Sequence, residues 1–173
     1  MFKNLTVRAR IIAAFTFVLA CTLGLGLFAV NRLSTVNDAV NELATNWLPA
    51  SNALGDAGQS FELARLRQLQ LVTAPESERA DIHASIDKAM QQLADAMKTY
   101  DQTVVTAEER VLSEKIAAEL KQYQANSELY GGMVTSGDIA GAQTYFMGDM
   151  QTQARELRAA IQADRTYQSE NGT

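Results

Sequence analysis

Residues 11–30 form a run of 20 positions without a single charged side chain. A helix rises about 1.5 Å per residue, so a helical run of this length extends roughly 30 Å, the thickness of one hydrocarbon core. Nothing else in the chain limits its fold as strongly, because backbone polar groups inside lipid must be paired within the segment that crosses it. The sequence therefore predicts a membrane-spanning helix over 11–30.

Basic residues on the two sides of this run predict its orientation. Three precede the run and only one follows it closely: Lys3, Arg8, Arg10 and then Arg32. Basic side chains near a membrane span favour the cytoplasmic side. We therefore expect residues 1–10 to be a cytoplasmic, basic N-terminus and residues 31–173 to be a domain on the opposite side of the membrane.

Two other interpretations of the run explain it less well. A cleaved signal peptide has an apolar stretch of about 7–15 residues that ends at small side chains, whereas this run ends at Leu27-Phe28-Ala29-Val30. A lipoprotein cleavage site at Cys21 would leave nine further uncharged residues, 22–30, after the lipidated cysteine. A cysteine facing lipid within an uncleaved span is the simpler interpretation.

The remaining composition restricts both fold and chemistry. With 10 glycines, 2 prolines and 7% aromatic residues, the chain lacks the turns and aromatic strands of an all-β domain. One cysteine, Cys21, and one histidine, His83, exclude a disulfide framework and the usual metal-ligand sets. We expect a solvated His83, no metal and no cofactor. No nucleophile with a base, acid–base pair or cofactor loop is visible, so we expect no catalytic residues and no enzyme.

Charge is distributed unevenly along the chain. Lys3, Arg8 and Arg10 are three of the 15 basic side chains, so residues 31–173 carry the other 12 against all 20 acidic ones, a formal charge of −8. An acidic surface repels phosphates, which argues against nucleic acid as a partner. The same charge also opposes the binding of any anion, unless local basic groups outweigh it.

A helical repeat begins directly after the predicted span. Apolar or small residues recur at alternating steps of three and four, the spacing of a coiled-coil seam. This repeat predicts one long helix that continues from the membrane segment to about Val72 and is interrupted only at Pro49, where a kink is expected. The seam positions are Leu33, Val36, Val40, Leu43, Trp47, Ala50, Leu54, Ala57, Phe61, Ala64 and Leu71.

Three further seams follow, each separated from the next by a short break. They predict helices over about 82–100, 112–134 and from 139 onward. Capping-box spacing at Thr73 to Glu76 and again at Thr106 to Glu109 marks the starts of the first two. Gly137-Asp138 marks the start of the third. Short loops make consecutive helices antiparallel neighbours, so the predicted fold is all-α: an antiparallel up-down four-helix bundle preceded by a transmembrane helix continuous with its first helix.

This arrangement resembles the sensor region of bacterial methyl-accepting chemotaxis proteins. The resemblance rests on the basic tail, the single span that leads into a long helix, the Asn-Trp-Leu-Pro stretch over 46–49, the arginines late in the first helix and Gly137-Asp138. It implies a periplasmic, ligand-binding domain over 31–173, anchored in the inner membrane. It also implies a homodimer through the first and fourth helices, a second span beyond the given sequence and a cytoplasmic output module that works with a chemotaxis adaptor and kinase.

The resemblance also implies where a small organic ligand binds. In amino-acid-sensing members, arginines late in the first helix hold the ligand carboxylates at the dimer interface, a role that would fall to Arg65 and Arg67 on either flank of the polar seam residue Gln68. Aromatic residues early in the fourth helix, here Tyr145 and Phe146, would lie beside the ligand. The arginine fork suits a carboxylate, but no third arginine is present near residue 58, so the ligand class stays open between a carboxylate and an amino acid.

Several alternatives remain at this stage. A second site could form inside one protomer, where Lys88, Arg110, Tyr123 and Tyr130 could meet. Arg65 and Arg67 could instead be flanking charges that pair with Glu62 or with a neighbouring helix. Gln68 could set only the helix register, and Tyr145 and Phe146 could be core residues. The same bundle also occurs on histidine kinases and diguanylate cyclases, and an anchored interaction bundle without a small ligand is a further possibility.

Overall fold

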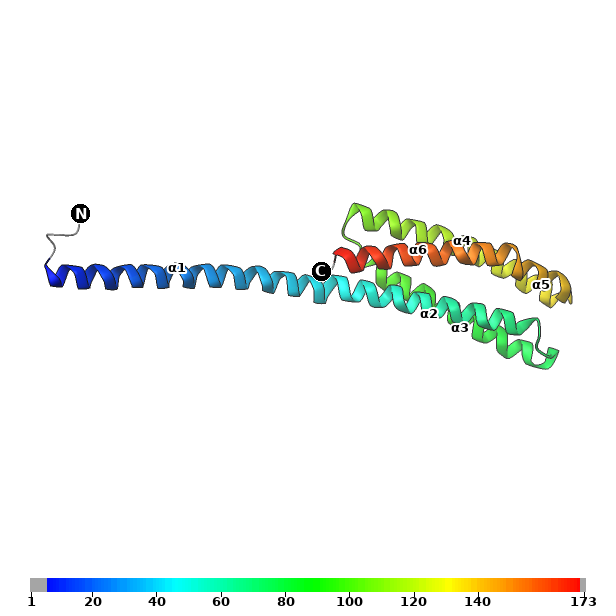
Figure 1. Cartoon of the computed structure of the whole chain (residues 1–173). Coiled ribbons are helices and arrows are strands. Elements are labelled where there is room, and N and C mark those ends of the chain that lie inside the picture. The colour runs from blue at the N-terminus through cyan, green and yellow to red at the C-terminus, as the bar shows by residue number, and fades with distance from the viewer. Residues whose placement is uncertain (1–5, 172–173) are drawn as a thin grey trace. The chain divides into compact units, whose positions relative to one another are not determined.

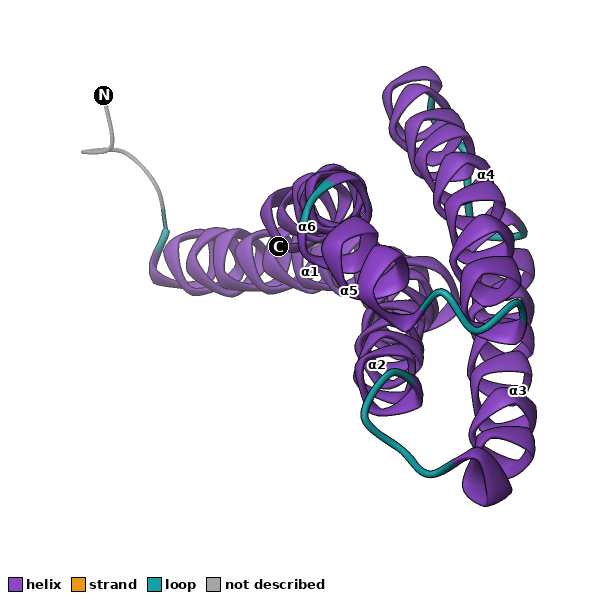
Figure 2. Ribbon diagram, turned by 90° about the vertical axis from the view of Figure 1, so that its right-hand side faces the viewer, coloured by secondary structure: helices purple, strands orange, loops and turns teal. Residues whose placement is uncertain are grey.

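The computed structural model describes residues 6–171, and within that range every regular element is helical (Figures 1 and 2). The first five residues of the predicted cytoplasmic tail lie outside the described residues. Contacts divide the chain into two compact units, Met1–Leu43 and Ala44–Thr173. The elements are α1 (Val7–Glu42), a π-helical turn (Leu43–Trp47), α2 (Leu48–Leu71), α3 (Glu76–Asp101), α4 (Ala107–Thr135), α5 (Ile139–Met147) and α6 (Asp149–Asn171).

Helix α1 is long and apolar, as predicted. Its most apolar window of 18 residues has a mean hydropathy of 2.4, and none of that window is buried against protein. Two hydroxyls of this helix are paired locally: Thr22 donates to the Val18 carbonyl at 2.9 Å and Thr35 to the Asn31 carbonyl at 3.2 Å, so neither is an unpaired donor. By length and composition, α1 is the one helix among the described residues that could cross a membrane.

The second unit is a four-helix bundle, which confirms the predicted fold. α2 packs beside α3, and α4 packs beside α5 and α6, while α2 also contacts α6 (Figure 1). α5 and α6 together form the fourth helix of the bundle. The short loops 72–75, 102–106 and 136–138 make consecutive helices antiparallel. The largest fully buried apolar and aromatic side chains are Leu54, Phe61, Leu71, Leu93, Tyr100, Ile116, Tyr123, Tyr130, Met150 and Leu157.

The predicted interruption near Pro49 is present but begins earlier. No residue from Val7 to Leu71 leaves the helical conformation, yet Leu43–Trp47 form a π-helical turn. Pro49 follows this turn directly, in a helix that does not break, and proline cannot supply the N–H of a regular i→i−4 helical bond. The irregularity is therefore a widened turn ahead of the proline.

Two of the three predicted helix starts are confirmed. Thr106 accepts a hydrogen bond from the Glu109 amide at 3.1 Å while the Glu109 carboxylate accepts from the Thr106 amide at 2.8 Å, a complete capping box. Gly137 has φ +85°, a conformation that favours glycine, and the Asp138 side chain caps α5 by accepting from the Gly141 amide at 2.9 Å.

The expected cap at Thr73 is wrong. Pro75 occupies the N-cap position of α3 and makes no side-chain cap bond. The Thr73 hydroxyl instead donates to the Gln70 carbonyl at 3.0 Å, so it pairs a carbonyl at the end of α2. Threonine side chains bond to whichever backbone group lies nearby, and here that group belongs to the preceding helix.

Candidate ligand-binding site

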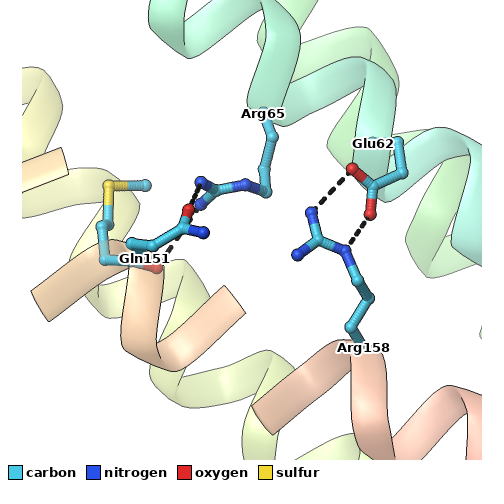
Figure 3. A network of polar contacts seen from close by, with 5 residues as sticks. Glu62, Arg65, Gln151 and Arg158 are labelled. Carbon is cyan, nitrogen blue, oxygen red and sulfur yellow. Dashed lines mark hydrogen bonds and ion pairs between the residues drawn. The ribbon is translucent and has the colours of Figure 1, made fainter. Parts of the chain in front are cut away.

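Arg65 enters the interior of the bundle from α2. Its side chain is only 7% exposed, and its guanidinium donates to the Met150 carbonyl at 3.4 Å and to the Gln151 side-chain oxygen (Figure 3). The Phe146 ring lies beside it, with 4.7 Å between Cζ and the ring centroid, a cation–π distance. No carboxylate lies within ion-pair distance of Arg65 among the residues that the structure describes. A buried positive charge is thus held by neutral acceptors and one ring.

These partners lie on both sides of a break in the fourth helix. The sequence predicted one helix from residue 139, but Gly148 leaves the helical conformation, with φ −99° and ψ −99°. Phe146 belongs to the last turn of α5, and Met150 and Gln151 belong to the first turn of α6. Glycine is a poor helix former, which locates the break. Arg65 therefore connects α2 to the two helical segments that meet there.

The nearby carboxylate of Glu62 is already paired. Arg158 of α6 donates to both of its oxygens, and the Arg158 Nη2–Glu62 Oε2 distance is 2.8 Å (Figure 3). The hydrogen bond from Arg158 holds the pKa of Glu62 below its usual value, and the same bond raises the pKa of Arg158. The two side chains are 51% and 44% exposed, so water and salt screen this pair. The predicted pairing of Glu62 with Arg65 or Arg67 is therefore wrong, whereas the other half of that alternative, pairing with a neighbouring helix, is what Arg65 does with α6.

Gln68 connects α2 to α4. It is fully buried, its amide nitrogen donates to the Ser127 hydroxyl at 2.7 Å, and its side-chain oxygen accepts from the Tyr123 hydroxyl. The Tyr130 hydroxyl donates to the Gln68 main-chain carbonyl. Burial raises the pKa of Tyr123 to about 12 and also raises the pKa of Tyr130. The polar seam residue is therefore a fully bonded group of the bundle core.

Arg67 lies on a different side of α2 from Arg65, because two residues advance a helix by roughly 200°. Its guanidinium donates to the Gln70 side-chain oxygen at 2.8 Å. It lines a cavity of 260 Å³ between α2 and α3, together with Leu63 and with Ser85, Lys88, Ala89 and Gln92 of α3. Within one chain the two predicted arginines thus do not share a site.

Tyr145 and Phe146 also diverge. Phe146 packs on Arg65 in the core, whereas Tyr145 is half-buried and its hydroxyl donates to the Asn126 side-chain oxygen at 2.9 Å. Tyr145 lines a separate cavity of 430 Å³ along with Met133 and Asp149. Of the five residues in the main predicted site, the structure brings only Arg65 and Phe146 into direct contact.

The alternative site is not assembled. Arg110 is exposed in the first turn of α4, and Tyr123 and Tyr130 follow it by 13 and 20 residues along the same helix. At 1.5 Å per residue these separations are roughly 20 and 30 Å. The two tyrosines meet at Gln68, far from Arg110, and Lys88 lines the cavity beside Arg67 instead.

A second buried polar cluster was not predicted as a site. Asp164 of α6 accepts from the Tyr100 hydroxyl and, at 3.3 Å, from the Gln168 amide, which also donates to Glu109 at 3.1 Å. Asp164 and Glu109 are both fully buried, and no basic residue within the described part of the chain forms an ion pair with them. The one sequence clue was that Asp164 continues the apolar seam of the predicted fourth helix, three residues after Ile161.

The two carboxylates of this cluster differ in their pKa. Burial raises the pKa of Asp164, with a smaller contribution from the charge of Glu109. Burial also acts on Glu109, but hydrogen bonds from the Thr106 and Val105 amides and from Gln168 outweigh it and hold the pKa of Glu109 below its usual value. Asp164 is therefore the member of the pair that protonates first.

Comparison with known proteins places this bundle in a family. Residues 4–173 match the family described as a four helix bundle sensory module for signal transduction, and the chain belongs to that family. This is a family of sensory signalling modules rather than of enzymes. Among curated proteins, no sequence matches the chain significantly.

A solved structure shares the fold. The periplasmic sensor domain of a sensor histidine kinase superposes with a TM-score of 0.65 at 19% sequence identity, over 78% of this chain and 89% of that chain. At this identity the likeness concerns the fold, and it agrees with the four-helix bundle described above.

Proposed function

We propose that this chain is the sensing region of a bacterial chemoreceptor and that it detects a small organic anion, a carboxylate or an amino acid, through Arg65. In this proposal α1 crosses the inner membrane over residues 11–30 and the bundle lies in the periplasm. The observation that carries the proposal is a buried guanidinium with only neutral hydrogen-bond acceptors, at the break between α5 and α6.

The proposed ligand competes with α6 for Arg65. Hydrogen bonds between two charged groups are stronger than those to neutral acceptors, and a carboxylate matches the planar arginine fork. A ligand carboxylate would therefore replace the Gln151 side chain and the Met150 carbonyl as the partner of Arg65. Its arrival would release the first turn of α6 from α2.

Signal transmission follows from that competition. The ligand-free state ties α2 to α6 through Arg65, and the ligand-bound state removes that tie, so the two states bind the ligand unequally, as any ligand-driven change requires. A shift of α6 by one or two ångströms is within the range of helix displacements in such transitions. We propose that this shift passes through a second span to a cytoplasmic module that acts with a chemotaxis adaptor and kinase.

The proposal includes a homodimer through α2 and α6. Arg67 lies outside the bundle core and lines a cavity with Lys88 and no acidic residue, so in the dimer it could attract the anionic ligand. Tyr145 would contact the ligand from a separate cavity. Crosslinking through single cysteines on α2 tests this arrangement. A chain that remains monomeric in membranes would contradict it.

A histidine kinase output is the second candidate, because the solved structure with the same fold is the sensor domain of a histidine kinase. A diguanylate cyclase output would use the same bundle, and a bundle without any ligand would only bind a partner. Native full-length protein in membranes distinguishes the outputs. Methyl labelling of glutamates supports a chemoreceptor, whereas phosphohistidine formation or cyclic diguanylate synthesis contradicts it.

Ligand binding is testable with the full chain in lipid nanodiscs. We expect a compound in a panel of carboxylates and amino acids to raise the melting temperature, since a ligand at a hundredfold excess over its Kd stabilises the folded state by about 2.7 kcal/mol. Arg65→Ala should abolish the shift, and Gln151→Leu, which removes the competitor, should strengthen binding. The matched control is Arg155→Ala, because Arg155 is an exposed arginine on α6. A ligand that binds Arg65→Ala as tightly as the wild type overturns the proposal.

A further inference from the structure

The buried cluster of Tyr100, Glu109, Asp164 and Gln168 holds the C-terminal part of α6. Tyr100 lies in the last turn of α3, Glu109 lies in the first turn of α4, and the other two lie one turn apart on α6. The cluster therefore connects three helices at the end of the bundle where α6 finishes (Figure 1). Neither the anion proposed for Arg65 nor the family match assigns a role to it.

The hydrogen bonds of this cluster leave one buried acceptor over. The Gln168 amide nitrogen donates to both carboxylates, at 3.1 Å to Glu109 and 3.3 Å to Asp164, and the Tyr100 hydroxyl donates to the other oxygen of Asp164. The side-chain oxygen of Gln168 is buried and has no hydrogen-bond partner among the residues that the structure describes. Buried acceptors are rarely left unpaired. With Asp164 charged, the cluster thus holds two negative charges and too few donors.

The surroundings of Asp164 supply no positive charge. The basic side chains next to the cluster in sequence, Arg110 of α4 and Arg165 of α6, are exposed. Residues 43–55, which contain the π-helical turn and the first turns of α2, have no titratable side chain. The one titratable side chain of α5 is Tyr145, at the opposite end of α6. Asp164 therefore faces the tyrosine of α3, the glutamate of α4 and the glutamine of its own helix.

Asp164 is the group of the cluster that changes its charge most readily. Glu109 has a pKa below its usual value and stays charged, whereas burial raises the pKa of Tyr100, which stays protonated. Burial and the charge of Glu109 raise the pKa of Asp164. A proton on Asp164 removes one of the two negative charges and adds one donor. A metal ion fits less well, because no group of three or more metal-ligating side chains is found in the described residues.

We propose that Asp164 is a proton-operated switch that sets how tightly the C-terminal end of α6 is held against α3 and α4. Neutral Asp164 keeps its bonds to Tyr100 and Gln168 without repelling Glu109, and α6 is held in place. When Asp164 is charged, two buried carboxylates repel each other across the Gln168 amide, and the end of α6 loosens. Acidification therefore strengthens this contact. The switch needs no anion at the arginine of α2, although it acts on the same helix.

Trp47 reports on the end of α6. Its ring centroid lies 6.2 Å from that of Tyr167, and the Tyr167 hydroxyl lies 3.1 Å from the Thr106 hydroxyl at the start of α4. Tyr167 follows Asp164 by three residues, so the two lie on one face of the helix. Loosening of this end therefore changes the surroundings, and the fluorescence, of the single tryptophan.

The test is a pH titration of Trp47 fluorescence with the full chain in lipid nanodiscs. We expect a transition above about pH 4, the ordinary range of an aspartate, which Asp164→Asn lacks because its side chain is neutral at every pH. Glu109→Gln removes a like charge and keeps a side chain that suits the capping box, so the midpoint should fall by roughly one pH unit. Tyr100→Phe removes a hydrogen bond to the charged form, so the midpoint should rise.

Control variants separate this switch from other titrating groups. Glu156→Gln removes an exposed carboxylate from the same helix and should keep the wild-type midpoint. The one histidine, His83, is not fully solvated as predicted, because it is half-buried in the wall of a 170 Å³ cavity between α2, α3 and α4. It precedes Tyr100 by 17 residues on α3, roughly 25 Å along the helix. His83→Gln and Arg65→Ala should therefore also keep the midpoint.

The direction of the midpoint shift distinguishes a switch from a merely structural cluster, whose variants change stability without moving the midpoint in opposite directions. Midpoints in Glu109→Gln and Tyr100→Phe that move the same way, or not at all, overturn the proposal. A wild-type transition that persists in Asp164→Asn or disappears in His83→Gln overturns it as well. So does a wild type without any transition.

Discussion

Replacing Tyr130 with phenylalanine removes one hydroxyl from the bundle interior and keeps the ring. The ring still packs against Phe146, at 5.7 Å between centroids. The lost hydroxyl leaves the Gln68 carbonyl without its donor. Helix α2 ends at Leu71, so Gln68 carries one of the last four carbonyls of that helix, which lack regular helical partners.

The local geometry prevents an easy replacement for this hydrogen bond. The Val72 amide, which would serve the Gln68 carbonyl in a continuing helix, is directed to the Gln70 carbonyl. Gln68 and Tyr130 are 0% and 1% exposed, so the carbonyl is shielded from bulk solvent, although both residues border a cavity. An unsatisfied buried acceptor costs about 1–3 kcal/mol. We therefore expect Tyr130→Phe to lower the free energy of unfolding by about 2 kcal/mol, which for a domain of this size lowers the Tm by roughly 8 °C.

Fluorescence of Trp47 is a suitable assay for this change. It is the single tryptophan of the chain, and its ring centroid lies 6.2 Å from that of Tyr167, so bundle unfolding changes its surroundings. Tyr145→Phe is the matched control: it also removes a bonded hydroxyl, but from a half-buried residue, where water substitutes. We expect its Tm to fall by less than about 2 °C. Equal shifts in the two variants would refute the reasoning.

Three further variants have expected outcomes in the same melting assay. Burial raises the pKa of Asp164, so the charged carboxylate destabilises the fold above that raised pKa, and this cost disappears as the pH falls toward the ordinary pKa of aspartate. Asp164→Asn should therefore melt at a higher temperature than the wild type at pH 7, and the difference should narrow by pH 4. A difference that stays constant with pH would contradict this. Thr106→Ala removes the capping box of α4 and should lower stability by about 1 kcal/mol, whereas Thr135→Ala, outside any N-cap, should have a smaller effect. Gly137→Ala places a side chain at φ +85° and should lower stability by about 1 kcal/mol, which an unchanged Tm would disprove.

Helical periodicity was sufficient to predict the architecture. An uncharged run of helix-forming length and a 3.6-residue apolar repeat are local properties of the chain, so they can be recognised without tertiary contacts. The capping box at Thr106 and the left-handed Gly137 were predictable for the same reason, since each involves neighbours within one turn. No comparable local signal marks the break at Gly148, because isolated glycines occur inside many regular helices.

The facing of each side chain was decided by tertiary packing. Arg65 and Arg67 occupy equivalent flanks of the seam in sequence, yet one lies in the core and the other in a groove, because helix rotation depends on how all four helices pack. Spacing along the chain likewise could not show that Gln68 bonds to α4, or that Gln168 joins Asp164 to Glu109 with no basic side chain of the described residues paired to either. Local periodicity shows which residues share a helix face, but only long-range contacts determine which polar side chains of that face are buried. The candidate sites of this protein depend on that burial.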